Sequence, residues 1–381
     1  MKSARLWDIF CKVIDNYGDI GVCWRLAADL ASRGQRVRLW VDKPDALAWM
    51  APGALEGRWP GIQVLARKDA LSEPVTVAAQ EPADVWIEGF GCDVPFELVA
   101  YRFGRGRSGS ARASRSPIWI DLEYLTAETY AERSHGLPSP VMQGPASGHT
   151  KFFLYPGFSG ATGGLLREAD LCARQSRFDR SAWLLNQGVR WSGERLVSLF
   201  CYEPAMLPQL LEQLRKNERP TRLLVTHGRA ASAVRHVLHG QEQAHLADFW
   251  ASEQLAVTLL PRLSQTDFDH LLWSCDLNFV RGEDSLVRAI WAGKAFVWQI
   301  YPQHDEAHHA KLQAFLDAMR APPSWRAFHW SWNGIGQQAL AQPDLAAWAA
   351  AVAKAGDWLR QRPDLTTGLL EFVKREQPGT E

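Results

Sequence analysis

Short apolar runs alternate with stretches of helical spacing along the first half of the chain. Within residues 21–34, GVCWRLAADLASRG, apolar residues recur at helical spacing and the pattern ends on glycine, which is typical of a capped helix. Apolar runs separated by such helices predict a parallel, doubly wound sheet. The runs that we expect to form buried strands are 6–13, 36–42, 62–66, 84–90, 118–125 and 152–155.

The same alternation restarts in the second half, after a segment at 175–194 that we expect to be a helix and a linker. A further helix is expected at 206–217, and helical patterns continue from His309 to the end. The predicted fold is therefore α/β, with Rossmann-like domains at 1–182 and 190–360 and a C-terminal helix (about 360–381) whose pattern also allows it to pack back on the first domain. We expect a ligand cleft at the carboxyl ends of both sheets. The strands expected in this half are 195–203, 222–228, 255–261, 276–280 and 294–302.

Composition excludes several classes of protein. A chain of 381 residues with 46% hydrophobic and 22% charged residues is typical of globular domains, not of a disordered segment. Lys+Arg and Asp+Glu both number 42, so no overall charge favours nucleic acid or a membrane surface. The six cysteines are scattered, and no signal peptide or membrane span of about 20 apolar residues is evident. We therefore expect a soluble, reduced, cytoplasmic protein.

The loop RGEDS, residues 281–285, lies between an expected strand and an expected helix of the second domain. Ser285 and its neighbours would lie at the helix N-terminus, where backbone N–H groups favour a phosphate, and Arg281 adds a planar cation. The alternative is an ordinary turn in which Ser or Asp caps the helix. Glu283 and Asp284 would repel a diphosphate, unless one caps the helix and the other accepts hydrogen bonds from sugar hydroxyls. A loop with both a cation and carboxylates favours a nucleotide sugar as the ligand. The order of strand, loop, helix and strand is also that of the donor half of GT-B glycosyltransferases.

The first-domain loop VIDNYGDIGVCWRLA, residues 13–27, follows a strand and opens a helix but lacks GxGxxG. It places Asp15 and Asp19 where a phosphate site would have glycines. Such carboxylates suit an acceptor, because they can take the proton of a nucleophile or hold a cationic substrate. The alternative is that Asp15 caps a turn and Asp19 caps the helix opening near Ile20, and spacing alone does not decide between the two.

A family resemblance rests on long motifs in both halves: IFCKVIDNYGDIGVCWRLA, IWIDLEYLTAE, SHGLPSP, KFFLYPGFSGATGGLLRE, LVSLFCYE and LLWSCDLNFVRGEDSLVRAIWAGKAFVWQIYPQ. Together they resemble the elongation factor P arginine rhamnosyltransferases (EarP), from about Ile9 to beyond Phe315. The resemblance implies the GT-B architecture and dTDP-β-L-rhamnose as the donor. It also implies that rhamnose is transferred, with inversion of the anomeric centre, to one arginine of translation elongation factor P, which activates the factor for rescue of stalled translation.

The resemblance assigns roles to individual residues. Asp19 matches the family's general base, Asp15 its companion carboxylate, and Glu283 a glutamate required for catalysis. A guanidinium has a pKa above about 12, so its nitrogen becomes a nucleophile only when its charge is held and a proton is removed, tasks that paired carboxylates suit. Two acceptor contacts are expected at Trp119 and Glu123. The positions expected to contact the donor are Phe200, Tyr202, Gln265, Arg281, Asp284 and Ser285, together with Gly18 and Gly21 of the first-domain loop.

The chain departs from the family pattern in two places. Arg262 stands where relatives tend to carry an aromatic residue that stacks on the thymine base, although a guanidinium plane can also stack there. The segment 101–117, YRFGRGRSGSARASRSP, is longer and more basic than in the family. Its composition is that of a flexible RNA-binding segment, but a solvated surface loop is favoured, and steering of an acidic partner is a third possibility.

Two segments contain metal-ligand types of residue, and we expect neither to bind a metal. His304 and His308 of QHDEAHH are four residues apart, but the glutamate is misplaced for H-E-x-x-H and no third ligand lies nearby. Asp267 and Asp269 spell DxD within a helical pattern, where an acid in the first turn is favoured for structural reasons. His227, at a strand end, is favoured as structural, not as a base. We therefore predict activity without metal, and no cofactor other than the nucleotide-sugar donor.

Two other functions remain open from the residues alone. One is a GT-B glycosyltransferase with another nucleotide sugar and a different acceptor. The other is a non-enzymatic nucleic-acid-binding module built on the basic segment.

Overall fold

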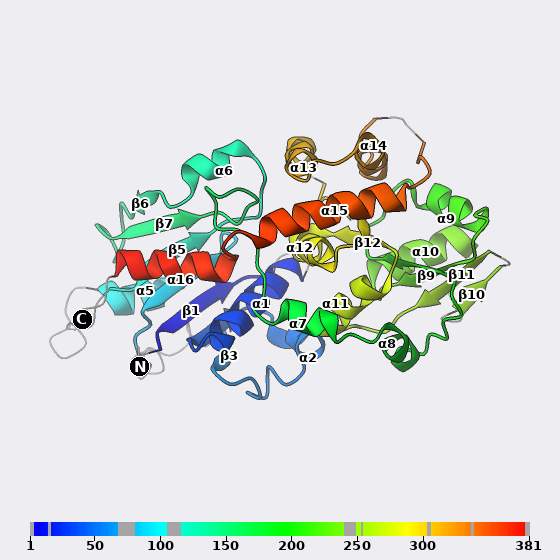
Figure 1. The fold of residues 1–381 in the computed structure, drawn as a ribbon. Helices are drawn as coiled ribbons and strands as arrows, with labels where there is room; N and C mark the ends of the chain where they lie inside the picture. The colour runs from blue at the N-terminus through cyan, green and yellow to red at the C-terminus, as the bar shows by residue number, and fades with distance from the viewer. Residues whose placement is uncertain are drawn as a thin grey trace. The chain divides into compact units, whose positions relative to one another are not determined.

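The computed structural model describes residues 4–13, 17–67, 81–104, 116–239, 249–252, 254–302, 306–336 and 339–377. The chain divides into two compact units, which we call the first unit (Met1–Ala169 with Arg362–Glu381) and the second unit (Asp170–Gln361). Most of their elements are labelled in Figure 1. Asp15, the segment 105–115 and His304 lie outside the described residues, so the predictions made for them stand as predictions.

The first unit contains a seven-stranded sheet in the order β3-β2-β1-β4-β5-β7-β6. All neighbouring strands are parallel except β6 and β7, which are antiparallel. The edge strand β6 was not predicted, because its sequence, PSP, contains no apolar run. The elements are β1 (Leu6–Cys11), α1 (Gly18–Ser32), β2 (Arg36–Val41), η1 (Pro44–Ala46), α2 (Leu47–Met50), β3 (Ile62–Ala66), β4 (Val85–Gly89), α5 (Phe96–Phe103), β5 (Ile118–Leu122), α6 (Thr129–Ser134), β6 (Pro138–Pro140), β7 (Thr150–Leu154) and α16 (Leu365–Glu376).

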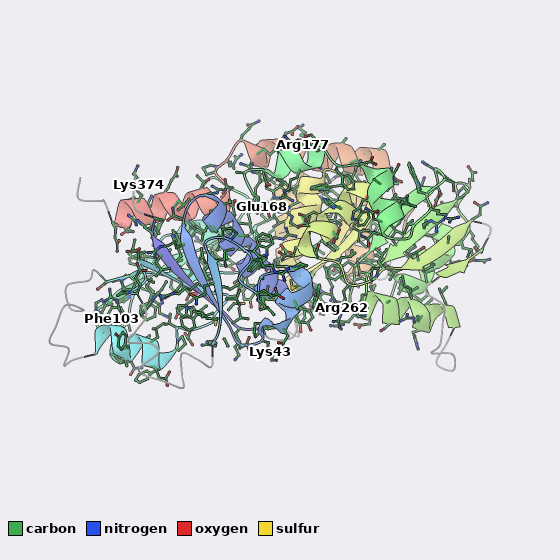
Figure 2. All side chains as sticks on the ribbon, turned by 90° about the horizontal axis from the view of Figure 1, so that it is seen from below. Lys43, Phe103, Glu168, Arg177, Arg262 and Lys374 are labelled. Carbon is green, nitrogen blue, oxygen red and sulfur yellow. The ribbon has the colours of Figure 1, made fainter. Side chains whose placement is uncertain are left out.

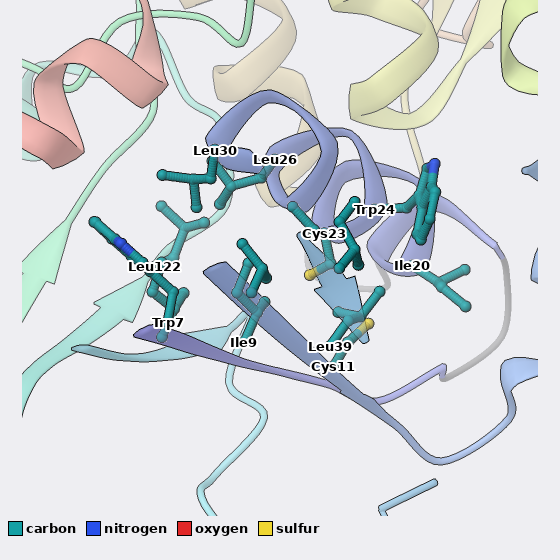
Figure 3. Packing of buried hydrophobic residues seen from close by; sticks show 14 of the residues in the cluster. Trp7, Ile9, Cys11, Ile20, Cys23, Trp24, Leu26, Leu30, Leu39 and Leu122 are labelled. Carbon is teal, nitrogen blue, oxygen red and sulfur yellow. The ribbon is translucent and has the colours of Figure 1, made fainter. Parts of the chain in front are cut away.

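Both faces of the central strands are buried, since every residue of β1 and β4 is buried, and this explains why these strands are mostly apolar. On one face, Leu26 and Leu30 of α1 lie over Ile9 and Leu122 of the sheet (Figure 3). The opposite face is covered largely by aromatic side chains, in which successive indoles meet edge to face. Several of the 18 tryptophans of the chain are therefore core residues.

The last helix, α16, returns to the first unit from the far end of the chain (Figure 1). Arg33 at the end of α1 joins it there, with one nitrogen 2.7 Å from Asp29 and 2.7 Å from Asp364, the N-cap of α16. Phe372 of α16 packs into the same cluster as α1. One half-buried cation between two carboxylates thus joins the first helix of the unit to a helix that follows the second unit in sequence.

The second unit contains a six-stranded sheet in the order β10-β11-β9-β8-β12-β13, parallel except for the antiparallel pair β10 and β11. The two-domain α/β class predicted from the alternation is confirmed. None of the described helices is long and apolar enough to cross a membrane. The elements are α7 (Leu171–Ser176), α8 (Arg180–Asn186), β8 (Arg195–Leu199), α9 (Leu207–Arg215), β9 (Thr221–Val225), α10 (Arg229–His239), β10 (Phe249–Ala251), β11 (Leu255–Leu259), α11 (Gln265–Ser274), β12 (Leu277–Arg281), α12 (Gly282–Ala292), β13 (Ala295–Gln299), α13 (Ala307–Ala318), α14 (Pro323–Trp332) and α15 (Leu345–Arg360).

Several strands end earlier than their apolar runs predicted. The run at 195–203, for example, forms a strand only as far as Leu199. The apolar pattern continues because Cys201 and Tyr202, beyond the end of β8, are also buried. An apolar run therefore marks burial, and the carboxyl end of a strand can lie well inside it.

A fully buried histidine ties α14 to the edge of this sheet. The Nε2 atom of His329 accepts a hydrogen bond from the backbone N–H of Trp298 at 2.9 Å. Its Nδ1 therefore carries the proton and donates to the carbonyl of Trp325 at 3.0 Å. Burial lowers the pKa of His329 to about 4, because the charged imidazolium is poorly solvated there.

The pH dependence of stability should reveal this histidine. Below the unfolded pKa of about 6.5, the unfolded chain binds a proton at His329 that the folded chain does not bind until about pH 4. The free energy of unfolding should therefore fall, by roughly 3 kcal/mol, as the pH drops through this window. We expect the fall to be smaller by about that amount in His329→Gln than in the wild type, as measured by denaturant titrations at several pH values. The exposed His236 provides a control, since His236→Gln should keep the wild-type slope. Equal slopes in all three proteins would contradict the assignment.

Candidate active site

The predicted donor loop lies where β12 ends and α12 begins. Gly282 starts the helix with a φ of +67°, a left-handed conformation that favours glycine. Its carbonyl accepts a hydrogen bond from the indole N–H of Trp298 at 2.9 Å. An added Cβ at this glycine would lie 3.7 Å from the hydroxyl of Tyr202. The chain thus turns sharply against an aromatic residue that follows β8.

The side chain of Ser285 stabilises this turn by hydrogen bonds to the backbone. Its hydroxyl accepts a hydrogen bond from the backbone N–H of Arg281 at 3.0 Å and donates one to the carbonyl of the same residue. Ser285 is only 3% exposed. Its hydroxyl therefore stabilises the turn, although the N-cap of α12 is Arg281, and any contact of Ser285 with a donor stays a prediction.

The side chain of Arg281 is the most informative feature of the loop. Its guanidinium carbon lies 4.6 Å from the ring centroid of Phe200 and 4.5 Å from that of Tyr202. Burial lowers the pKa of Arg281, and its buried Nη1 has no hydrogen-bond partner among the described residues. A buried cation with an unused donor is costly by itself, and an anionic ligand would compensate that cost.

Tyr202 is held rigidly beside this cation. Its backbone N–H donates to the side-chain oxygen of Gln299 at 2.8 Å, and burial raises the pKa of its hydroxyl. A second guanidinium, that of Arg229, lies 5.1 Å from the same ring and forms an ion pair with Glu203. Two guanidiniums therefore lie against one phenol at the carboxyl edge of this sheet, and Glu203 balances the charge of one of them.

The catalytic glutamate implied by the family lies in the first turn of α12. The Oε1 atom of Glu283 accepts a hydrogen bond from Nζ of Lys311, on α13, at 2.6 Å. The side chains of Glu283 and Lys311 are 20% and 23% exposed. Asp284 is half-buried in the same turn. Lys311 was not predicted, because it lies 28 residues away in a helix without any recognisable motif.

The DxD pair has structural partners. Asp267 lies in the first turn of α11, as predicted, and accepts from the indole N–H of Trp183 at 3.0 Å. Asp269 is buried and accepts two hydrogen bonds from Arg288, at 2.9 and 2.7 Å. Gln265 is the first residue of the same helix. Among the described residues, no group of three or more His, Cys, Asp or Glu side chains is placed to hold a metal ion.

A cavity of about 360 Å³ lies in the second unit where β9 and β11 end and α10 begins. His227, at the end of β9, is exposed and faces this cavity. Arg262 follows β11 and is exposed (Figure 2). The cavity is lined by His227, Gly228, Ala231, Ser232, Arg235, Leu259 and Leu260.

In the first unit, Asp19 lies in the first turn of α1 and is half-buried. The N-cap of this helix is Tyr17, so Asp19 is not the capping residue of the alternative hypothesis. The N-terminal turn of a helix stabilises a carboxylate. Gly21 donates its N–H to the carbonyl of Tyr17 at 3.0 Å, and Gly18 has open space on the side where a Cβ would lie. Open space at Gly18 is compatible with a ligand near Asp19.

The two predicted acceptor contacts, on and after β5, differ in exposure. Trp119 is 5% exposed, packs edge to face on Trp86 at 5.4 Å, and has the ammonium of Lys151 4.6 Å from its ring. Glu123 is half-buried just beyond the strand, and burial raises its pKa. In this structure Trp119 is a core residue, whereas Glu123 lies nearer the surface.

A second carboxylate, Asp121, lies beside Glu123. Burial and then the charge of Glu123 raise the pKa of Asp121 to about 6, and its Oδ1 is buried without a hydrogen-bond partner among the described residues. Tyr124 and Tyr130, nearby in sequence, are 41% and 44% exposed. We name Asp121, Glu123, Tyr124 and Tyr130 the acidic–aromatic group. The alternation that directs Trp119 to one face of the sheet also directs Asp121 there, and this signal in the sequence was overlooked.

Asp19 and the acidic–aromatic group belong to the same edge of the sheet. Strand β1 pairs with β4, and β4 with β5, all in parallel, so the carboxyl ends of these strands meet there. In the second unit, β8 and β12 are likewise parallel neighbours, and Tyr202 and Arg281 lie at their carboxyl ends. Each unit therefore carries its candidate residues at the carboxyl edge of its own sheet, with carboxylates in the first and both guanidiniums and carboxylates in the second.

The family model described as Elongation-Factor P (EF-P) rhamnosyltransferase EarP matches residues 7–374. The protein-arginine rhamnosyltransferase of Pseudomonas aeruginosa is 42% identical over 383 residues, covering 96% of this chain and 98% of that protein. The protein of the same description from Pseudomonas putida is 41% identical over 402 residues, covering 98% and 99%.

Solved structures agree with this assignment. One, described as the structural basis for EarP-mediated arginine glycosylation of translation elongation factor EF-P, has a TM-score of 0.62 and 30% identity, covering 98% of this chain and 100% of that chain. Arabidopsis thaliana UGT89C1 has a TM-score of 0.52 with 11% identity, covering 98% and 99%, and shares the fold alone. The two α/β units thus form the GT-B glycosyltransferase architecture that was predicted. The chain belongs to the EF-P rhamnosyltransferase (EarP) family of glycosyltransferases.

Proposed function

We propose that this chain transfers rhamnose from dTDP-β-L-rhamnose to an arginine of translation elongation factor P, with inversion of the anomeric centre, and so activates the factor for rescue of stalled translation. The observation that carries the donor half of this proposal is the half-buried Arg281, whose guanidinium lies over the rings of Phe200 and Tyr202 and whose buried Nη1 has no hydrogen-bond partner among the described residues. Family membership supports the arginine acceptor, and the solved relative described above acts on EF-P.

The donor half needs positive charge where the leaving diphosphate forms. Arg281 supplies a planar donor at the start of α12, and the N-terminal N–H groups of that helix add a fixed dipole. Such preorganised donors stabilise the charge that develops on the leaving oxygen, and this stabilisation usually contributes more to catalysis than any other single effect. We therefore propose that the diphosphate leaves without a metal ion.

The acceptor half needs negative charge. Asp19 takes a proton from the guanidinium as the arginine nitrogen attacks the anomeric carbon, so that the C–N bond forms while the bond to the diphosphate oxygen breaks. A single displacement of this kind inverts the anomeric centre. We place Asp15 as the companion that orients the guanidinium, and Asp121 and Glu123 as carboxylates that attract the cationic acceptor segment.

The first test is direct. We expect purified protein, mixed with elongation factor P and dTDP-β-L-rhamnose in the presence of EDTA, to add one deoxyhexose to the factor, as read from its intact mass. The gain should disappear when the acceptor arginine is replaced by lysine. No gain, with dTDP still raising the melting temperature, would keep the donor half and discard the acceptor. Activity lost with EDTA and restored by Mg²⁺ would contradict the metal-free mechanism.

Asp19→Asn separates catalysis from donor binding. General-base catalysis typically contributes about 10²–10⁴-fold, so turnover should fall by at least about 100-fold, while the dTDP affinity measured by calorimetry should stay near that of the wild type. Asp45→Asn is a matched control, because Asp45 is exposed in the same unit. Loss of dTDP binding in Asp19→Asn would show that Asp19 has another role.

Arg281→Met tests the anion site. Hydrogen bonds to charged groups contribute about 1.5–3 kcal/mol, so the dissociation constant of dTDP should rise by roughly 10- to 150-fold. Arg190→Met, at an exposed position of the second unit, should leave it unchanged. A wild-type dissociation constant in Arg281→Met would place the diphosphate elsewhere.

A further inference from the structure

Lys311 reaches from α13 to the first turn of α12, and both helices are labelled in Figure 1. Its ammonium lies 2.6 Å from Oε1 of Glu283, and the side chains of both residues are about four-fifths buried. Enclosure alone does not set this pair apart, because Arg222 and Glu194 form an ion pair whose side chains are 17% and 11% exposed. The pair is distinguished by its place, since Glu283 lies in the first turn of α12, two residues after Arg281.

Helix α13 also contacts the backbone of the loop that contains Glu283, through Trp298. The neighbours of Lys311 on α13 that face inward include Phe315, whose ring lies 5.0 Å from the indole of Trp298. That indole in turn donates its N–H to the carbonyl of Gly282 at 2.9 Å. Helix α13 thus reaches the donor loop twice, through Trp298 to the backbone of Gly282 and through Lys311 to the side chain of Glu283.

The charges of the loop explain why such a contact is needed. Glu283 follows Arg281 by two residues, and a carboxylate so close to a diphosphate site repels the ligand that Arg281 attracts. An ammonium on the carboxylate cancels most of that repulsion. A carboxylate has about four acceptor positions, so one ammonium does not exhaust its capacity to accept a hydrogen bond from a sugar hydroxyl.

We propose that Lys311 is a positioning residue that holds the carboxylate of Glu283 in place and neutralises it toward the diphosphate. The turn thereby carries an acceptor for the sugar and an anion site for the diphosphate side by side. This inference rests on the proposed function, since it takes a nucleotide diphosphate as the ligand. It assigns to α13 a part in donor binding that acts through Glu283 and not through direct contact.

A double-mutant cycle on dTDP binding tests this role, because binding is measurable even when catalysis is lost. With Glu283 intact, Lys311→Met should raise the dissociation constant of dTDP at least about 10-fold, because the carboxylate of Glu283 then faces the diphosphate without the ammonium of Lys311. Glu283→Gln should bind dTDP as tightly as the wild type or more tightly. In the Glu283→Gln background, Lys311→Met should change the dissociation constant by less than about 3-fold.

Three further variants make the cycle specific. Lys311→Arg keeps the charge and should recover dTDP binding and much of kcat, which a merely structural defect of Lys311→Met would not predict. Lys311→Gln gives a second neutral variant if Lys311→Met fails to fold, as judged by melting temperature. Lys294→Met, at an exposed lysine just after α12, should match the wild type.

The possible results are distinguishable. An equal loss of affinity from Lys311→Met in both backgrounds would overturn the inference, because Lys311 would then contact the nucleotide directly. Unchanged binding and turnover in Lys311→Met would overturn it as well. Absence of dTDP binding by the wild-type protein would instead overturn the proposed donor, and the inference with it.

Discussion

Parallel strand pairing is the constraint on which the rest of this structure depends. Parallel neighbours cannot be joined by tight turns, so most strands of both sheets are followed by a crossover that contains a helix, and these helices bury the faces of the sheets. The side chains on these faces therefore pack in hydrophobic clusters, as the indoles of Trp86 and Trp119 do. Polar chemistry is left to the edges, and at the carboxyl edge each strand leads into a loop or the start of a helix. Asp19 and Arg281 both occupy such positions.

Whether a buried charged group has an ion-pair partner separates structural residues of this chain from candidate functional ones. Asp8 and Arg38 form a two-pronged pair at 2.6 and 2.7 Å, and Asp269 and Arg288 form another at 2.9 and 2.7 Å. Removal of either partner from such a pair would leave an unpaired charge in the core, so these pairs act as fixed parts of the fold. Arg281 is different, because it rests on two aromatic rings and its buried Nη1 donates to nothing in the described part of the chain. An incomplete set of partners at a sheet edge is the physical mark of a site.

The sequence predicts elements and site residues well where the signal is local, and poorly where it depends on a neighbour. The runs at 36–42 and 62–66 became strands within a residue of their predicted bounds, because both are rich in Val, Leu and Ile and are followed by polar residues. The edge strand Pro138–Pro140 exists only because β7 offers it a pairing partner. The RGEDS loop was likewise recognisable because its residues are adjacent in sequence. No spacing rule connects Lys311 to Glu283, since that contact depends on how α13 packs on the sheet. Contacts between residues of different helices and strands are therefore the part of a site that cannot be predicted from the sequence.

The equal totals of acidic and basic residues conceal a local division of charge that suits the proposed chemistry. A guanidinium must approach carboxylates, and a diphosphate must approach cations, so a protein that takes both ligands needs patches of opposite sign and not a uniform field. The carboxyl edge of the first sheet carries half-buried acids, while that of the second carries Arg229 and Arg281 around Tyr202. In the proposed transfer, a proton passes to a carboxylate of the first unit as negative charge moves onto the diphosphate beside Arg281, so each group of side chains is matched to the charge that develops beside it. A carboxylate beside Arg281 would weaken anion binding unless its charge were compensated locally. The ion pair of Glu283 with Lys311 supplies that compensation.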